Sequence, residues 1–120
     1  MIYAGFGFRS EARLESLLDA LGRAGGRPEA LATAHDKAID PVFRALARRL
    51  GLRIVPVAAE RITAERTETR SAVSLRHRRT GSVAEAAALA AAGPGARLLA
   101  PRAISSDRMA TCALAEGGRR

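Results

Sequence analysis

The sequence is poor in residues that mark several common classes of protein. It has no tryptophan, one tyrosine and three phenylalanines, so aromatic residues make up 3% of its 120 residues. Proteins that bind single-stranded nucleic acid stack bases on aromatic side chains, and this chain offers few of them. The single cysteine, Cys112, cannot form an internal disulfide, which is typical of proteins from a reducing cytoplasm. Because Cys112 lies in an apolar run, we expect a buried thiol.

Long apolar runs and metal-binding patterns are also lacking. The longest apolar run, Ala86–Ala92, is far shorter than the roughly 18 residues that a membrane-spanning helix needs. The first residues lead directly into an apolar segment without a basic leader, so we expect no secretory signal and a cytoplasmic protein. The two histidines, His35 and His77, lie far apart in the sequence, and we therefore expect no bound metal.

Positive charge is in excess. There are 20 lysine and arginine residues against 12 acidic ones, and the formal net charge is +8. Such a charge favours an acidic partner. The arginines are scattered through every segment, and no nucleic-acid-binding signature is present, so we do not expect nucleic acid to be that partner. Lys37 is the only lysine, and its place in a polar turn makes it a candidate for anion binding.

The apolar pattern predicts one α/β domain over residues 1–120, with a frayed tail at 117–120. The expected strands are Ile2–Phe6, Ala30–Ala34, Leu52–Val57, Ala96–Ala100 and Met109–Ala115. The expected helices run from Ser10 to Gly25, from about Asp40 to Gly51, over Ala59–Glu65 and over Ser82–Ala92. Residues 67–79 remain open between a loop and a brief strand at Ala72, Val73 and Leu75. Alternating strands and helices predict a three-layer α/β/α sandwich with a mainly parallel, mixed sheet. The last two strands have no helix between them, so we expect an antiparallel pairing there.

Three polar turns lie where an apolar strand gives way to a helix. They are Gly5–Ser10, Thr33–Lys37 and Thr80–Glu85. In an open α/β sheet such turns gather beside the carboxyl ends of the strands, where ligands usually bind. Helix N-termini at that edge carry unpaired N–H groups and a partial positive charge, which favours anions.

The first turn resembles the beginning of a dinucleotide-binding fingerprint. Gly5 and Gly7 fit it, but the third glycine is missing, and no acidic residue follows the second strand at the expected distance. The Walker pattern is absent as well, and we expect no cofactor. Either the two glycines let a ligand approach the backbone while Arg9 binds a carboxylate, or the segment is a tight turn with a solvated arginine.

The other two turns also allow both a structural and a functional interpretation. His35 and Asp36 are adjacent and no serine is in register with them, so a catalytic triad is unsupported, and Asp36 could cap the second helix. Lys37 places an ammonium at a helix start, where a bound anion would offset the unfavourable dipole. Ser82 and Glu85 form a capping box, although the backbone N–H groups of this turn could also face a ligand.

An ordered set of segments is similar to a known family. The segments are Gly5–Arg9, Ala32–Ala38, Leu46–Leu52, Gly81–Leu89, Leu98–Leu99 and Ala110–Ala113. Together they resemble the family of the cobalamin-biosynthesis protein CobE and the C-terminal domain of CbiG, over almost the whole chain.

The resemblance implies a role in building the corrin ring of vitamin B12. CbiG-type proteins open a lactone on a cobalt-precorrin and release a two-carbon fragment, and they carry additional N-terminal sequence. A domain of this size on its own is more similar to CobE. We therefore expect a protein that binds a precorrin or corrinoid intermediate, with other cobalamin-biosynthesis enzymes as possible partners.

A precorrin carries several carboxylate arms, which arginine forks can hold, and an apolar ring, which Phe6 or Phe8 could contact. The residues expected to border this ligand are Gly5, Phe6, Gly7, Arg9, Thr33, Lys37, Gly81, Ser82 and Glu85. Three functions stay open: a binding protein, a hydrolase of a precorrin lactone or acyl group with Lys37 or Glu85 as acid or base, and a charge-driven module that binds nucleic acid or protein.

Overall fold

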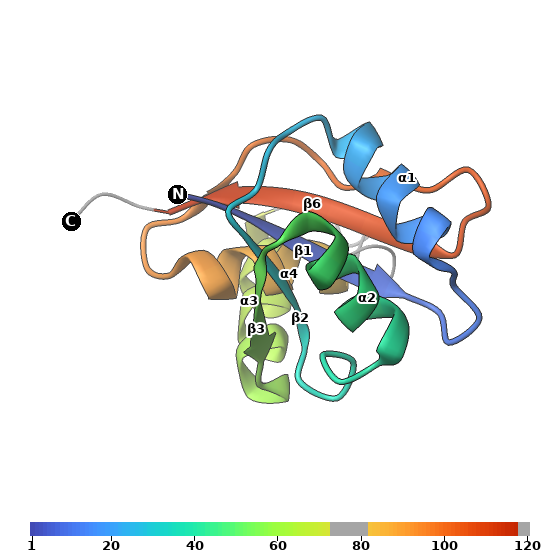
Figure 1. The fold of residues 1–120 in the computed structure, drawn as a ribbon. Coiled ribbons are helices and arrows are strands. Elements are labelled where there is room, and N and C mark those ends of the chain that lie inside the picture. Colours follow the sequence, from blue (N-terminus) through green and yellow to red (C-terminus); the bar gives the residue numbers. More distant parts are fainter. Residues whose placement is uncertain (73–81, 118–120) are drawn as a thin grey trace.

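A mixed β-sheet forms the centre of the molecule. The computed structural model describes residues 1–72 and 82–117, and within them the sheet has six strands in the order β3-β2-β1-β6-β4, with β5 also paired to β6. The strands are β1 (Ile2–Phe8), β2 (Ala30–Ala34), β3 (Arg53–Val57), β4 (Arg97–Leu98), β5 (Ala103–Ile104) and β6 (Ala110–Glu116). The helices are α1 (Leu14–Ala24), α2 (Pro41–Leu50), α3 (Ala59–Ala72) and α4 (Ser82–Ala92) (Figure 1). β1, β2 and β3 are parallel, and β6 runs antiparallel to β1.

Helices cover both faces of the sheet, and the expected three-layer sandwich is confirmed. α1 and α2 lie on one face, and α4 lies on the other with α3 packed against it (Figure 1). The core under α1 and α2 contains large side chains such as Leu17, Phe43 and Leu46. The core under α4 is built mostly from small side chains such as Ala86 and Ala87. The two faces of the sheet are therefore packed at different spacings.

Small residues let α4 lie directly on β1. A Cβ atom added to Gly5 would meet the carbonyl oxygen of Ala84 and lie 2.5 Å from the backbone nitrogen of Ala88. Only a residue without a side chain fits between the strand and the helix at that point. This close approach brings the N-terminal turn of α4 beside the end of β1.

The beginning of the chain differs from the sequence-based expectation. β1 continues to Phe8 because β6 pairs with it as far as the Phe8–Ala110 register. The expectation that Ser10 caps the first helix is wrong, since α1 begins only at Leu14. The intervening residues form a turn in which the N–H of Ala12 donates to the carbonyl of Arg9 at 3.0 Å.

The ends of α2 are close to the expected positions. The carboxylate of Asp40 accepts a hydrogen bond from the N–H of Val42 at 2.9 Å, and Pro41 occupies the first turn. Asp40, and not Asp36, is therefore the capping residue. The helix ends at Gly51, whose φ of 69° lies in the left-handed region.

The second half of the chain has a longer helix and shorter strands than expected. α3 continues past Glu65 as far as Ala72, so the brief strand suggested there is wrong for Ala72, while Val73 and Leu75 lie outside the described residues. β4 covers only Arg97–Leu98 of the expected strand. β6 runs antiparallel to β4, as expected. It also pairs antiparallel with β1 and with β5, a short strand, and neither of these pairings was predicted.

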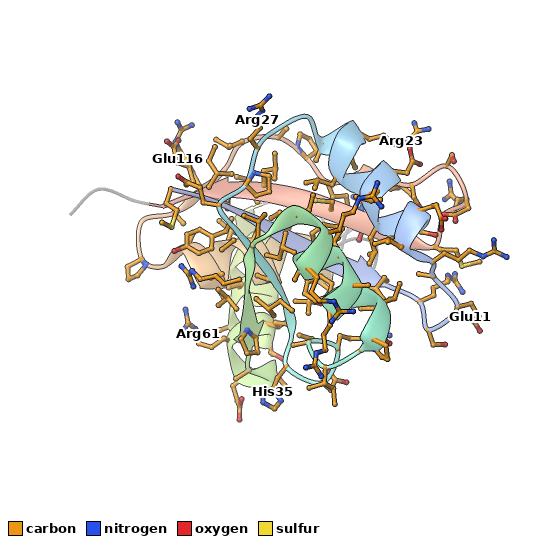
Figure 2. All side chains as sticks on the ribbon, in the orientation of Figure 1. Glu11, Arg23, Arg27, His35, Arg61 and Glu116 are labelled. Atoms are coloured by element: carbon orange, nitrogen blue, oxygen red, sulfur yellow. The ribbon has the colours of Figure 1, made fainter. Side chains whose placement is uncertain are left out.

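Polar groups cover the outside of the molecule. Glu11, Arg27 and Arg61 are exposed and point outward on different sides (Figure 2). Gly117, in the expected tail, donates its N–H to the carbonyl of Met1 at 2.9 Å, and residues 118–120 lie outside the described part. In the part of the chain described, no helix is both long and apolar enough to cross a membrane.

Candidate functional site

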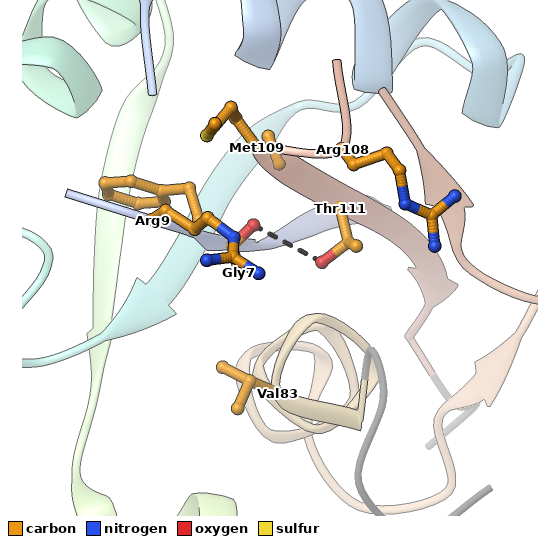
Figure 3. A pocket seen from close by; sticks show the side chains of 8 residues that line it. Gly7, Arg9, Val83, Arg108, Met109 and Thr111 are labelled. Carbon is orange, nitrogen blue, oxygen red and sulfur yellow. Dashed lines mark hydrogen bonds between the residues drawn. The ribbon is translucent and has the colours of Figure 1, made fainter. Parts of the chain in front are cut away.

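A pocket of about 230 Å³ opens where β1 ends and where β6 and α4 begin (Figure 3). It is lined by Gly7, Phe8, Arg9, Val83, Arg108, Met109, Ala110 and Thr111. Since β1 is one of the three parallel strands, the pocket lies at the carboxyl edge of the parallel part of the sheet. Ligands of open α/β folds usually bind at this edge.

The base of the pocket is formed by Gly7 and Thr111, which face each other across the β1–β6 pair. The hydroxyl of Thr111 donates to the carbonyl of Gly7 at 3.3 Å (Figure 3). A Cβ atom added to Gly7 would lie 3.1 Å from that hydroxyl and 3.6 Å from the Cβ atom of Val83. The missing side chain at Gly7 therefore keeps open the space between the strand and the first turn of α4.

Phe8 also lines the pocket, and its ring packs toward α2. Phe8 is half-buried and stacks on Phe43, with ring centroids 5.6 Å apart and an interplanar angle of 9°. The Nζ atom of Lys37 lies 4.8 Å from the centroid of the Phe8 ring, which is a cation–π contact. Lys37, from the turn between β2 and α2, therefore lies beside Phe8, although it does not itself line the pocket.

The turn between β5 and β6 carries two further lining residues, Arg108 and Met109. The buried hydroxyl of Ser105 accepts hydrogen bonds from the N–H groups of Met109 at 3.2 Å and Ala110 at 3.1 Å. The same hydroxyl donates to Asp107 Oδ1 at 2.6 Å. Ser105 therefore fixes the shape of the turn from inside.

Two contacts attach this turn to α1. Ser16 donates its hydroxyl hydrogen to Asp107 Oδ2 at 2.6 Å, and Asp19 Oδ2 accepts the N–H of Ser106 at 2.7 Å. Hydrogen bonds from the hydroxyls of Ser105 and Ser16 lower the pKa of Asp107 to about 2. The Ser106 N–H and Arg23 lower the pKa of Asp19. Both carboxylates are thus charged at neutral pH.

Several of the predicted site residues lie at this edge. Gly7 and Arg9 line the pocket directly. Lys37 contacts the ring of the lining residue Phe8 but does not line the pocket itself. Ser82 is the first residue of α4 and precedes the pocket-lining Val83. Gly81 lies outside the described residues.

Other predicted residues lie beneath or beside the pocket. Phe6 and Thr33 are fully buried, and the Thr33 hydroxyl donates to the Phe6 carbonyl at 2.9 Å, which links β2 to β1. Gly5 lies under α4. Glu85 accepts the backbone N–H of Arg102 at 3.2 Å and does not line the pocket. A direct role for these four residues in ligand binding stays a prediction.

The sequence analysis considered only the backbone N–H of Val83, and it missed Arg108, Met109 and Thr111. The signal for the last three was the polar segment before the final strand, where Ser105 and Asp107 are typical turn residues. The antiparallel pairing of the final strand with β1 places that turn beside the end of β1. That pairing with β1 was not predicted, so the turn residues alone did not lead to Arg108.

The composition of the pocket favours anion binding over covalent catalysis. Among the described residues, no group of three histidine, cysteine or acidic side chains could hold a metal ion. Cys112 is fully buried, as expected, and burial raises the pKa of its thiol, so it is a poor nucleophile. Arg9 and Arg108 instead supply two guanidinium groups near the N-terminus of α4. Guanidinium groups and helix N-termini both favour carboxylates.

Comparison with known families decides the assignment. Residues 2–115 match the family described as "Cobalamin synthesis G C-terminus". The chain belongs to this family. It is a cobalamin biosynthesis protein of the CbiG and CobE type, as the resemblance of its turns indicated.

Solved structures of this family share the fold. Cobalamin biosynthesis protein chiG from Agrobacterium tumefaciens is 39% identical with a TM-score of 0.78, and the match covers 99% of this chain and 100% of that one. CobE, from the cobalamin biosynthetic pathway, is 34% identical with a TM-score of 0.70, and the match covers 96% and 89%.

A more distant structure shows the fold alone. It is a cobalamin biosynthesis protein G homolog from Sulfolobus solfataricus, 20% identical with a TM-score of 0.66, and the match covers 95% of this chain and 36% of that one. A comparison with curated proteins gave no match.

Proposed function

We propose that this protein binds a precorrin or corrinoid polycarboxylate in the pocket at the ends of β1 and β6. The observation that supports the proposal is that Arg9 and Arg108, from two separate turns, line one pocket together with the half-buried Phe8. Lys37, from a third turn, contacts the ring of Phe8. A corrin intermediate has both parts that such a pocket selects, an apolar ring and carboxylate arms. The family match indicates the pathway, because the family is one of cobalamin synthesis.

The size of the pocket indicates how such a ligand would be held. Sites that enclose a drug-sized molecule have volumes of about 300 to 1,000 Å³. A volume of about 230 Å³ fits one edge of the macrocycle and its acid arms, with the rest of the ring on the surface. Each exposed ion pair contributes only about 0.5 to 1 kcal/mol, so several together with ring contact would be needed for micromolar affinity.

This mode of binding suits an accessory protein that holds an intermediate for the cytoplasmic enzymes of the pathway. Phe8 would contact the edge of the ring, and displacement of Lys37 from the Phe8 ring would free its ammonium group for a carboxylate. Phe6, the other phenylalanine considered for this contact, is fully buried and would support Phe8 through Phe43.

An absorbance titration with hydrogenobyrinic acid tests the proposal. We expect saturable binding by the wild-type protein, with an affinity reduced about two- to fivefold in Arg9→Ala and in Lys37→Ala, because each variant loses one exposed charge contact. Arg27→Ala, at an exposed position before β2, is the matched control and should bind normally. Thermal unfolding should show that all variants are folded. Equal affinity in the wild type, Arg9→Ala, Lys37→Ala and Arg27→Ala would contradict the proposal.

The same samples separate the other two functions. A change in ligand mass with turnover, detected by mass spectrometry, would indicate a hydrolase and would call for a search among residues such as Lys37 and Glu85. Steeply salt-dependent binding to DNA with no preference for the corrinoid would indicate a charge-driven interaction module.

A further inference from the structure

Arg108 has an unusual backbone conformation for its residue type. Its φ of 62° makes it the one non-glycine residue in the left-handed region among those the structure describes. That region is uncommon for side chains other than asparagine and aspartate, and it costs free energy unless the surroundings impose it. Glycine would occupy this position without strain. The presence of a long cationic side chain there calls for an explanation.

The surrounding turn holds Arg108 in place through hydrogen bonds on both sides. Its own N–H donates to the carbonyl of Ser105 at 2.9 Å. The next residue, Met109, donates its N–H to Ser105 Oγ at 3.2 Å and to Asp107 Oδ1 at 3.1 Å. Because Asp107 is also bonded to Ser16 of α1, the turn cannot rotate independently of that helix. The backbone from which Arg108 projects is therefore fixed before any ligand arrives.

Arg108 and Arg9 flank the same space. Figure 3 shows their guanidinium groups on either side of Thr111, next to the first turn of α4 that carries Val83. The N–H of Arg9 donates to the carbonyl of Met109 at 2.9 Å, so the segments that carry the two arginines are bonded to each other. Both side chains are exposed, and no described carboxylate forms an ion pair with either of them. Within the described residues, two positive groups thus line one pocket without an ion-pair partner.

We propose that Arg108 and Arg9 form a carboxylate clamp that makes this pocket select free carboxylate arms over amidated ones. The proposal rests on the proposed function, because it assumes that the ligand is a corrin-type polyacid. A guanidinium group donates two parallel hydrogen bonds to the two oxygens of a carboxylate. A primary amide offers one oxygen and presents its own NH₂ donors to the arginine, so it is a poor partner. The bound molecule would therefore be an intermediate whose acid arms have not yet been converted to amides.

The variant Arg108→Gly tests the clamp without disturbing the turn, since glycine relieves the positive φ. Its affinity for hydrogenobyrinic acid should fall about five- to tenfold, as expected for loss of a charge-assisted hydrogen-bonded pair. Its affinity for the same macrocycle with primary amides in place of the acids should change less than about twofold. Arg108→Asn, another residue that tolerates this conformation, should behave in the same way. Arg108→Lys should recover only part of the affinity, because it keeps the charge and loses the fork.

The outcomes separate this proposal from the proposed function. If the wild-type protein binds neither the acid nor the amide, the proposed function fails and the clamp fails with it. If the wild-type protein binds the acid, and both Arg108→Gly and Arg108→Asn bind acid and amide as the wild type does, the clamp is wrong and the proposed function stands. An equal loss of affinity for acid and amide would also overturn the clamp, since it would show a general effect on the pocket. Arg27→Gly is the matched control and should leave both affinities unchanged.

Discussion

At the scale of single residues, the two glycines of β1 serve different purposes. Gly5 has no room for a side chain because the backbone of α4 lies against it, with Ala88 N at 2.5 Å from an ideal Cβ position. Gly7 has more room, and its missing side chain leaves a space that is part of the pocket. One glycine brings the helix close to the strand, and the next one on the same face keeps a space beyond the helix end.

The close contact at Gly5 predicts a large loss of stability on substitution. Gly5→Ala should lower the free energy of unfolding by about 1 to 3 kcal/mol, because α4 must move away from the sheet. The matched control is Gly22→Ala in α1, where a new Cβ atom meets nothing within 4 Å. That variant should gain about 0.5 to 1 kcal/mol from the lower backbone entropy of alanine. Urea unfolding measures both, and a Gly5→Ala protein as stable as the wild type would contradict the packing described here.

A second residue-scale prediction concerns Asp107 and acid. The hydroxyls of Ser105 and Ser16 lower its pKa from 3.8 to about 2 in the folded protein. The ionised form is therefore favoured by folding, and its contribution to stability is complete above pH 3.8 and is lost as the pH falls toward 2. Asp107→Asn should have a lower melting temperature at neutral pH and a flatter decline between these two pH values. Asp19, whose pKa is lowered by the Ser106 N–H and by Arg23, should leave some decline in the variant. A variant with the same pH profile as the wild type would contradict the assigned contacts.

At the scale of the elements, the start of α2 depends on a single side chain. Asp40 accepts the Val42 N–H at 2.9 Å, whereas Asp36 lies earlier in the exposed turn. Asp40→Ala should cost about 1 kcal/mol of stability, the usual value for loss of an N-cap. Asp36→Ala should change stability by no more than about 0.5 kcal/mol. Chemical denaturation measures the free energy of unfolding of both variants. A larger loss in Asp36→Ala than in Asp40→Ala would indicate that Asp36 is the capping residue.

The elements that were predicted well are those whose apolar spacing reflects burial. α2 has Phe43, Leu46 and Ala47 on its buried face, and its ends have the expected proline and glycine signals. α3 was cut short because Ile62 is the one buried side chain among residues 59–65, so this stretch of the sequence carries little apolar pattern. The late start of α1 followed from a turn at Arg9–Ala12 that is closed by backbone hydrogen bonds, which the side-chain pattern does not show.

The candidate site was predicted in part, and for a physical reason. Gly7, Arg9 and Lys37 lie at or just beyond the carboxyl ends of β1 and β2, where ligands of open α/β folds usually bind. Gly7 and Arg9 line the pocket, and a binding role for Lys37 stays a prediction. Arg108 belongs to a turn between two antiparallel strands, to which that rule does not apply. Its place at the same edge depends on the register of β6 with β1, in which Ala110 pairs with Phe8. Long-range register of this kind is set by tertiary packing and is not visible in local sequence.

At the scale of the whole molecule, positive charge has two separate consequences. The net charge of +8 attracts any anion at long range, and exposed arginines such as Arg27 and Arg61 lie on different sides of the surface (Figure 2). The pocket adds a local effect, because Arg9 and Arg108 approach the same ligand groups from two segments. The general attraction raises the rate of encounter, whereas the local arrangement determines how long the ligand stays.

Two double variants distinguish these consequences. Arg9→Gln with Arg108→Gly and Arg27→Gln with Arg49→Gln each remove two positive charges, and the second pair lies at the opposite edge, where β2 and β3 begin. In stopped-flow binding of hydrogenobyrinic acid, the second pair should slow association by less than about threefold and leave dissociation unchanged. The first pair should speed dissociation about tenfold or more, since it loses two charge-assisted contacts. Raising the salt concentration from about 50 mM to about 300 mM should reduce the difference in association while the difference in dissociation persists. Equal effects of the two pairs on dissociation would show that overall charge, and not the pocket, retains the ligand.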